Sequence, residues 1–537
     1  MSLSRYTLTS LARTSKSLHA VSIHALWEYL EGLGPLLRLL PPGPWTEDPS
    51  TSRHGISVRP LYWSRPPDIS TNWPHLQHIT PPDQVEWTRF NHYAKHVQRL
   101  YWQDERDVSP YVLAALSAYR PAGQPLLPQL RELTWDETCE KHFPFVHLFL
   151  TPNIRRLKLT LSDFNPPTMM ALFEHVGSAC KRVDHLTIRT GIIGDEMWES
   201  MGVVDNAFTQ LLRSLPELRH FIGEGYLPAS CIEALAGLPK LAVLELYVHS
   251  EEMHMIAPSA FWSSRHGQWF NALENLELYM DQMDGSTVSI LSAIQSGKLQ
   301  ELRVGADYQP DTYMLKAHFD IFARAAYRNS LTSLRLHFDR PLHETTPCPA
   351  LDVAEALEPL YACPHIDILH IRTPSLVASA HALQGIAHAW RLASLSLVSN
   401  YYSPTAKSRL TLEGLIPLAR HCPDLRELEL PVSADAVPDS ETLAQLLPAP
   451  SRCALRSLAV FDAAIEDAHA VADFLARVFP AISVLQHVCT AEGADWFDTY
   501  DSETHDRWAT VRRLLLGEVD SPVQWPDDSS ESEPESE

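Results

Sequence analysis

The stretch Leu425-Arg-Glu-Leu428-Glu-Leu430 carries leucine at its first, fourth and sixth positions, and this spacing recurs along most of the chain. Four further stretches keep all three leucines: Leu241-Ala-Val-Leu244-Glu-Leu246, Leu273-Glu-Asn-Leu276-Glu-Leu278, Leu331-Thr-Ser-Leu334-Arg-Leu336 and Leu392-Ala-Ser-Leu395-Ser-Leu397. Looser copies, with other and mostly apolar residues at some of these positions, begin at Val97, Leu130, Ile154, Val183, Leu218, Leu299, Ile366, Leu455 and Ile482. So many regularly spaced copies indicate a repeat architecture.

Each copy predicts a short strand, and the segments between the copies predict helices. The last three positions alternate apolar, any, apolar, which suits a β-strand because successive side chains point to opposite faces. Proline favours extended backbone just before it. Six copies have a proline two residues before their first position: Pro152, Pro216, Pro239, Pro364, Pro423 and Pro480. Apolar residues at helical spacing predict helices over Thr168–Cys180, Ala207–Leu215, Ser286–Gln295, Phe319–Ala326, Val353–Tyr361, Ala380–Trp390, Leu412–His421, Glu441–Leu447 and Asp467–Phe479.

The order strand, turn, helix, turn decides the expected fold class. Such a series gives parallel strands with helices on one side. Between Leu130 and Ile482 the copies lie about 29 residues apart on average, the long end of the range for leucine-rich repeats. We therefore predict an α/β leucine-rich-repeat solenoid over residues 97–516, with a curved parallel sheet on its concave face and helices on its convex face. A small helical segment over residues 1–41, and a linker with an N-terminal cap over residues 42–96, would precede it.

Charge and composition disfavour several classes of function. The 537 residues carry a net charge of −23, and such an acidic chain is a poor ligand for nucleic acid or for an anionic membrane surface. No apolar run is long enough to predict a membrane span. The eight cysteines form no C-x-x-C motif, which indicates buried thiols in a reducing compartment rather than disulfides or a zinc site. We expect a cytoplasmic or nuclear protein.

The sequence contains no motif for catalysis or for a cofactor. It has no H-E-x-x-H, and Gly223-Glu-Gly225 lacks the third glycine of a phosphate-binding loop. His92 and His96 are four residues apart on an expected helix and could seat a metal, but no third ligand accompanies them. We therefore expect no catalytic, cofactor-binding or metal-binding residues, and a protein that is not an enzyme.

Residues 8–40 predict two or three short amphipathic helices with a break at Gly32–Pro35. By themselves these helices could cap the solenoid, since the ends of a solenoid need a cover. The first 27 residues contain no acid, which is also a property of mitochondrial presequences. We favour the helical interpretation.

Part of this segment also resembles a known family. Leu11-Ala-Arg-Thr-Ser-Lys-Ser-Leu18, then Ala25-Leu26-Trp27 and then Leu33-Gly-Pro35-Leu-Leu-Arg-Leu-Leu40-Pro41 resemble the second half of the F-box in fungal F-box proteins with leucine-rich repeats. Trp87–Leu100 is similar to the segment that leads into the first repeats of that family. The resemblance implies a non-catalytic substrate-recognition subunit of a Skp–cullin–F-box ubiquitin ligase. Its Skp-type adaptor would contact Leu11, Leu18, Leu26, Trp27 and Leu30.

The resemblance departs from the family pattern at its start. An F-box normally opens with a Leu-Pro-x-Glu-like helix that supplies much of the adaptor surface, whereas only Met1–Tyr6 precede the second helix here. Either the gene start is assigned too late or the protein carries half an F-box. The alternative function is a leucine-rich-repeat scaffold or adaptor with no link to a ubiquitin ligase.

The register of the repeat predicts which side chains face a partner protein. In each strand, the residue between the last two apolar positions and the residue after them point away from the core, onto the concave face. Aligned in this way, Glu245, Tyr247, Glu277 and Tyr279 form an acidic and aromatic patch. By the same alignment, Arg303, Arg335, His337, His370 and Arg372 form a basic patch suited to an acidic or phosphorylated segment. Ordinary surface variation, or internal pairing of the two charge signs, is the alternative.

The C-terminal residues 517–537 are acidic and rich in serine, which predicts a disordered tail. Ser530 and Ser532 each have glutamate three residues later and resemble sites for acidophilic kinases. A simple solvating tail is the favoured interpretation.

Overall fold

The computed structural model describes residues 5–40, 46–47, 58–59, 84–103, 108, 110–120, 124–137, 142–161, 166–190, 198–225, 227–248, 269–340, 350–399, 410–461, 464–488 and 502–517. The chain divides into two compact units, Met1–Asp281 with Gly285–Lys298, and Gln282–Asp284 with Leu299–Glu537. Most of the expected linker and the tail beyond residue 517, including Ser530 and Ser532, lie outside the described residues.

The first unit is built on parallel strands that stack in the order in which they follow one another along the chain. They are β1 (Tyr29–Glu31), β4 (Arg99–Gln103), β5 (Glu132–Glu137), β6 (Arg156–Leu161), β7 (His185–Thr190), β8 (His220–Glu224), β9 (Val243–Val248) and β10 (Asn275–Gln282). A separate antiparallel pair is formed by β2 (Thr46–Glu47) and β3 (Val58–Arg59).

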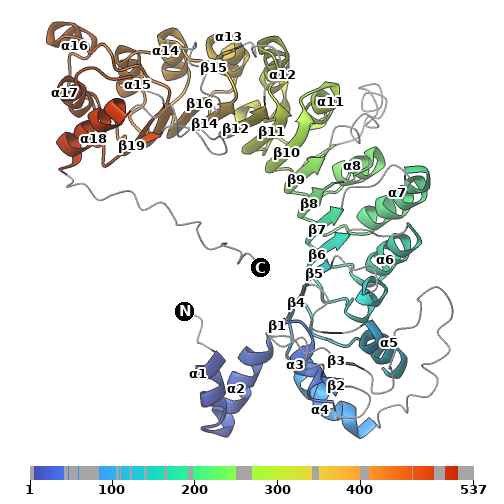
Figure 1. The fold of residues 1–537 in the computed structure, drawn as a ribbon. Coiled ribbons are helices and arrows are strands. Elements are labelled where there is room, and N and C mark those ends of the chain that lie inside the picture. The colour runs from blue at the N-terminus through green and yellow to red at the C-terminus, as the bar shows by residue number, and fades with distance from the viewer. Residues whose placement is uncertain are drawn as a thin grey trace, which may run out of the picture. The chain divides into compact units, whose positions relative to one another are not determined.

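The helices of the first unit connect these strands. They are α1 (Arg5–Ala12), α2 (Lys16–Trp27), α3 (Gly34–Leu37), α4 (Gln84–Ala94), α5 (Pro110–Tyr119), η3 (Phe143–Leu148), α6 (Pro166–Ala179), α7 (Trp198–Arg213), α8 (Ala229–Ala236) and α11 (Gly285–Ala293). Figure 1 shows that α5 to α8 lie on one side of the strands. We call the other side of the sheet, in either unit, the strand face.

The second unit repeats this plan. Its parallel strands are β11 (Glu301–Tyr308), β12 (Ser333–Arg340), β14 (Ile368–Thr373), β16 (Ser394–Ser399), β17 (Glu427–Leu430), β18 (Ser457–Phe461) and β19 (Val484–Val488). Its helices are α12 (Thr312–Arg324), η5 (Ala326–Asn329), α13 (Val353–Leu357), η6 (Glu358–Ala362), α14 (Ala380–Ala389), η7 (Leu412–Leu415), α15 (Ile416–His421), α16 (Ser440–Leu446), α17 (Ala468–Val478) and α18 (Ser502–Leu516). The short strands β13 (Leu351–Asp352) and β15 (Leu376–Val377) form a second parallel pair.

The structure confirms the role expected for the leucine motif. The fold is an α/β solenoid of the leucine-rich-repeat type. In every copy of the motif, a strand begins two residues after the first motif position. In the copy that contains β9, the three motif leucines, Leu241, Leu244 and Leu246, are at most 2% exposed, whereas Glu245 and Tyr247 are only partly buried. A helix is present at each position predicted between the copies, but α7 begins nine residues before the expected Ala207 and α12 begins seven residues before the expected Phe319.

The repeat begins earlier than predicted, which corrects the expected boundary at residue 97. Residues 29–31 are not helical: they form β1, whose Leu30 pairs with Leu100 of β4. The local sequence Trp27-Glu-Tyr-Leu30-Glu-Gly32 is a degenerate copy of the motif, with tryptophan and glycine at two of the three leucine positions. Gly32 has a φ of 78°, a conformation that glycine adopts without strain, and its N–H donates to the Tyr101 carbonyl.

In the second unit, cysteine thiols in the turns contact the repeat that precedes them. The Sγ atoms of Cys363, Cys422 and Cys453 lie 3.8, 3.5 and 3.9 Å from the carbonyl oxygens of Phe322, Trp390 and Leu425 in the repeats before them. Burial raises the pKa of Cys363 and Cys453 to about 11. The described cysteines are free and buried, as expected.

Candidate functional site

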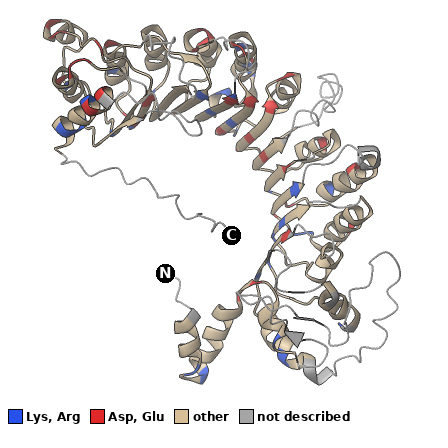
Figure 2. Cartoon of the chain, in the orientation of Figure 1, with Lys and Arg blue, Asp and Glu red and all other residues tan. Residues whose placement is uncertain are grey.

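The acidic and aromatic patch forms a regular ladder on the strand face of the first unit. The register pairs Glu245 with Glu277 and Tyr247 with Tyr279 across β9 and β10. The two tyrosine rings stack with centroids 6.2 Å apart, and the Tyr247 hydroxyl donates to Glu277 Oε1 at 2.7 Å. Figure 2 shows acidic residues on these two strands. The predicted side chains are therefore adjacent, and Tyr247 contacts both Glu277 and Tyr279.

The basic patch lies on the strand face of the second unit, with the predicted register. Arg303 pairs with Arg335, which in turn pairs with His370, and His337 pairs with Arg372. Arg372 and His337 are exposed, whereas the other three are partly buried. The predicted side chains form two adjacent columns.

An acidic neighbour reduces the charge of this patch. Glu301 Oε1 accepts from Arg303 Nε and Nη2 at 2.9 and 2.8 Å, and it lies 3.9 Å from Arg335 Nε. Asp339 Oδ1 lies 2.8 Å from His337 Nε2. The internal pairing that the sequence left open is therefore present, and the patch is less basic than its residue list indicates.

His370 lies on β14, the last of the three strands that carry the basic patch. Its Nε2 is 2.8 Å from Ser394 Oγ, whose hydroxyl donates to Glu427 Oε2 at 3.1 Å. Burial and, secondarily, Arg335 lower the pKa of His370. Because Ser394 gives its one proton to Glu427, it can only accept from His370, which fixes the proton on Nε2.

Part of the strand face in the second unit is buried rather than exposed. Val398, Ala459 and Phe461, on β16 and β18, are 2%, 3% and 8% exposed although they lie at strand-face positions. A partner protein could therefore reach the strand face of this unit mainly on β11, β12 and β14.

The F-box-like residues separate into two groups. Leu11 and Leu26 are partly buried on α1 and α2, while Leu18 is 42% exposed. Trp27 packs its ring on Tyr93, with centroids 4.7 Å apart, and Leu30 is 4% exposed within β1. The expectation that Leu30 contacts an adaptor is therefore wrong, because its side chain is buried in the sheet.

Two exposed apolar side chains of the same helices were not predicted. Tyr6 on α1 is 88% exposed and Val21 on α2 is 70% exposed. With Leu18 they are exposed apolar side chains of the helix pair α1–α2, and we call these three residues the hairpin patch. Helical spacing could have grouped Leu18 with Val21, since residues three apart share a helix face.

The described residues contain no group of three histidine, cysteine or acidic side chains with the geometry of a metal site. His92 and His96 do lie near each other, with ring centroids 6.0 Å apart, and His96 also contacts His24. Within the described part of the chain, no helix is long and apolar enough to cross a bilayer.

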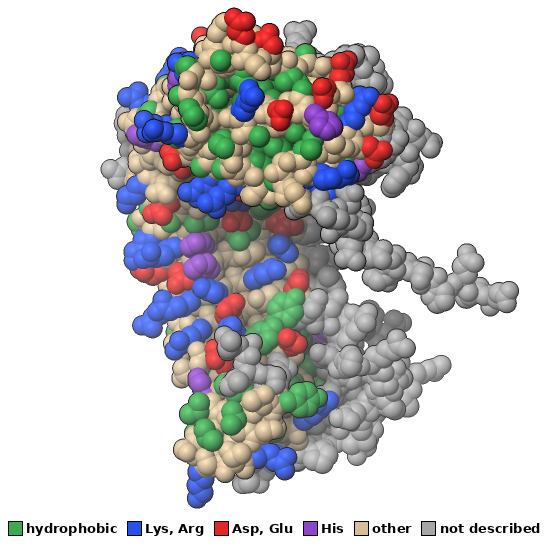
Figure 3. All heavy atoms as spheres, turned by 90° about the vertical axis from the view of Figure 1, so that its left-hand side faces the viewer, with side chains coloured by type: hydrophobic (Ala, Val, Ile, Leu, Met, Phe, Trp, Pro, Cys, Tyr) green, Lys and Arg blue, Asp and Glu red, His purple; other side chains and the backbone are tan. Residues whose placement is uncertain are grey.

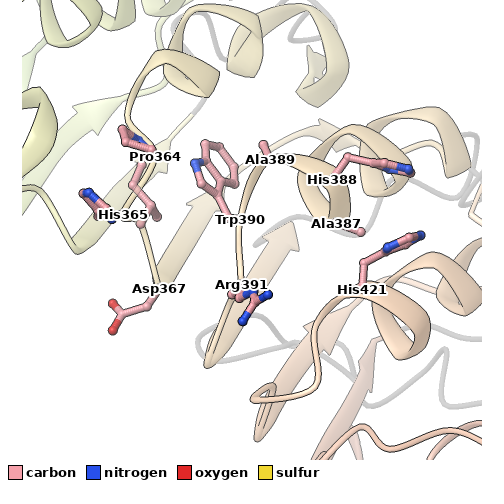
Figure 4. A pocket seen from close by; sticks show the side chains of 10 residues that line it. Pro364, His365, Asp367, Ala387, His388, Ala389, Trp390, Arg391 and His421 are labelled. Atoms are coloured by element: carbon pink, nitrogen blue, oxygen red, sulfur yellow. The ribbon is translucent and has the colours of Figure 1, made fainter.

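A pocket of about 540 Å³ opens beside the turns that precede β14 and β16. It is lined by Pro364, His365, Ile366, Asp367, Ala387, His388, Ala389, Trp390, Arg391 and His421. Figure 4 shows His388 and His421 on one side of it and Asp367 on the other. The two imidazole rings are 4.5 Å apart. The His388 Nδ1 is bound to the Gln384 carbonyl, and no catalytic arrangement of a nucleophile with a base is present among these residues.

Comparison with known proteins gives weak matches. No protein-family model matches the sequence, and no curated protein matches it. The crystal structure of the Rad7 and Elc1 complex in yeast matches at 13% identity, over 71% of this chain and 83% of that chain, with a TM-score of 0.31. A crystal structure of a protein from Bacteroides fragilis matches at 9% identity, over 64% of this chain and 77% of that chain, also with a TM-score of 0.31. Similarity at this level does not carry a function over.

Proposed function

We propose that this protein is a non-catalytic recognition subunit that binds a partner protein on its strand face. The observation that supports the proposal best is the ladder of Glu245, Tyr247, Glu277 and Tyr279. Tyrosine is enriched among the residues that dominate protein interfaces, because a large rigid ring gives much contact area. Stacking and the bond to Glu277 hold these rings in place before binding, which lowers the entropic cost of association.

The ladder is tested by charge reversal at its centre. In the Glu277→Lys variant, the Tyr247 hydroxyl loses its acceptor and the patch changes sign, so we expect the affinity for a partner to fall at least about tenfold. The measurement is quantitative mass spectrometry of proteins captured on the full-length chain, followed by titration of the recovered partner. Glu274→Lys is the matched control, because Glu274 is exposed in the turn before the same strand. Equal recovery by both variants would contradict a role for the ladder.

We further propose that the recognised protein is a substrate of a Skp–cullin–F-box ubiquitin ligase, in the cytoplasm or nucleus. Support comes from the F-box-like sequence and from the hairpin patch of Tyr6, Leu18 and Val21. Leu18 and Val21 lie three residues apart on α2 and share a helix face, and grouped apolar side chains mark interaction sites more often than single exposed ones do. In this proposal α1–α2 binds a Skp-type adaptor, and Leu30 supports the site from within the sheet.

The adaptor link predicts that the Leu18→Asp and Val21→Asp double variant loses its adaptor. Two carboxylates placed in an apolar contact would have to be desolvated, so we expect at least about a hundredfold weaker binding. Co-expression with a Skp-type adaptor and affinity purification measures this. Ala20→Asp, also exposed on α2, is the control for helix stability. If the wild-type chain does not retain the adaptor either, the ligase link is wrong.

A scaffold without a ligase link is the second candidate. Trp27 and Leu30 favour it, because both serve the solenoid: one packs on Tyr93 and the other pairs with Leu100. In that case α2 and β1 are simply the first repeat, and the strand face binds its partner without adaptor recruitment. A wild-type chain that binds partner but not adaptor would support this candidate.

A further inference from the structure

A row of arginine and histidine side chains follows the edge of the first unit at which its strands begin. Its members stand at the first position of a strand or directly before it: Arg99, Arg131, Arg155, Arg156, His185, Arg219 and His220, which we call the basic edge. The register places Arg156 opposite His185, and His185 opposite His220. In the lower half of Figure 3, cationic and histidine side chains gather along one margin of the surface. This row stands out on a chain with a net charge of −23.

The acidic residues along this edge only partly balance it. Glu28 lies 3.4 Å from Arg99, Glu132 lies 3.9 Å from Arg156, and Asp184 lies 3.5 Å from Arg155. These arginines are about half exposed or more, so such pairs are weak and screened by water. Among the described residues, no carboxylate lies within ion-pair distance of Arg131 or Arg219, and both side chains are exposed.

The histidine pair lies in the middle of the basic edge. The rings of His185 and His220 stack with centroids 4.0 Å apart and an angle of 12°. His185 Nδ1 is bound to Asp184 Oδ1 at 2.6 Å. Burial lowers the pKa of His220, as do His185, Arg156 and Arg219, while Asp184 opposes them. The permanent charges that act on His220 are two arginines, Arg156 and Arg219, and one carboxylate, Asp184, so an anion placed here would be attracted even while His220 is neutral.

We propose that the basic edge binds an extended acidic segment of a partner protein. The strands β4 to β8 span about 19 Å at their usual spacing of ~4.8 Å, which is the length of about six residues of extended chain. Carboxylates along such a segment can each accept from an arginine fork. A short acidic segment contacts this edge alone, whereas a long polyanion such as a nucleic acid would also meet the acidic remainder of the surface. The basic edge shares no residue with the ladder or with the hairpin patch, so this proposal does not depend on them.

The test uses fluorescein-labelled deca-glutamate and the full-length protein, with binding measured by fluorescence anisotropy at low ionic strength. Arg131→Glu and Arg219→Glu should each weaken binding about tenfold. Arg213→Glu is the control, because Arg213 is an exposed arginine at the end of α7, six residues from Arg219, and makes the same charge change. The control should stay within about twofold of wild type.

Acidity gives an independent readout. A bound carboxylate favours protonated His220, so the wild-type protein should bind deca-glutamate more tightly at pH 6 than at pH 7.5, and His220→Gln should remove much of this difference. Three results would overturn the proposal: no binding, equal weakening by Arg219→Glu and Arg213→Glu, or tighter binding of a ten-residue deoxythymidine strand than of deca-glutamate. The last result would identify the basic edge as a nucleic-acid surface.

Discussion

Replacement of Trp135 by alanine is expected to lower the free energy of unfolding of the first unit by about 3–5 kcal/mol, as for other buried aromatic residues. The side chain is fully buried. Its ring stacks on Trp102 of the neighbouring strand, with centroids 4.6 Å apart and an angle of 7°, and it also contacts Phe149. Removal leaves a large cavity beneath two strands that can close only if the sheet moves. Urea unfolding followed by far-ultraviolet circular dichroism measures the change.

Trp135→Phe is the matched variant for this prediction. Phenylalanine keeps an aromatic ring beside Trp102 and removes the indole N–H, which is buried and has no hydrogen-bond partner among the described residues. We therefore expect it to cost less than about 2 kcal/mol. A loss below about 1 kcal/mol for the alanine variant, or equal losses for both variants, would show that the aromatic stack does not stabilise the unit.

Acidification is expected to destabilise the end of the second unit through His487. Its ring stacks on Trp508 of α18, with centroids 5.9 Å apart, and both ring nitrogens are buried without a hydrogen-bond partner among the described residues. Burial, and then His505, lowers the pKa of His487 from 6.5 to about 4. The unfolded chain takes up this proton first, so stability falls as the pH drops from about 6.5 to about 4. The loss reaches about 2–3 kcal/mol at the lower end of this range.

His487→Phe isolates this effect from the other histidines. Burial also lowers the pKa of His318 and His370 in the same unit, so the wild-type protein has several sources of acid sensitivity. Phenylalanine can stack on Trp508 without titrating. The stability of this variant relative to wild type should therefore rise by about 2–3 kcal/mol between pH 7 and pH 4. The same pH dependence in both proteins would exclude His487 as a source of acid sensitivity.

The strands were predictable because the residues that define them are local. Alternation of core and surface positions within six residues sets each strand and its register, so the ladder of Glu245, Tyr247, Glu277 and Tyr279 followed from alignment alone. The strand β1 was missed because Trp27 and Gly32 replace leucines, and a tryptophan after a helical run reads as part of the helix. Its detection required the pairing of Leu30 with Leu100, which lie seventy residues apart in the sequence.

The charge of the predicted basic patch could not be read from the alignment. Glu301 and Arg303 both lie near the start of β11. Whether Glu301 neutralises Arg303 depends on their side-chain rotamers, which the repeat spacing does not determine. The same holds for the basic edge, whose members stand at the second and third positions of the motif, to which the alignment assigned no face. Coverage of Val398 and Phe461 is likewise a tertiary property that strand alternation does not encode.

The buried thiols allow the opening of each unit to be followed by chemical modification. Cys180 and Cys231 lie in the first unit, and Cys363, Cys422 and Cys453 lie in the second. In the folded protein these thiols are inaccessible to reagents. They are also protonated, because burial raises the pKa of each. An alkylating reagent can therefore modify them only when the surrounding repeat opens, so the order of modification records the order in which the repeats come apart.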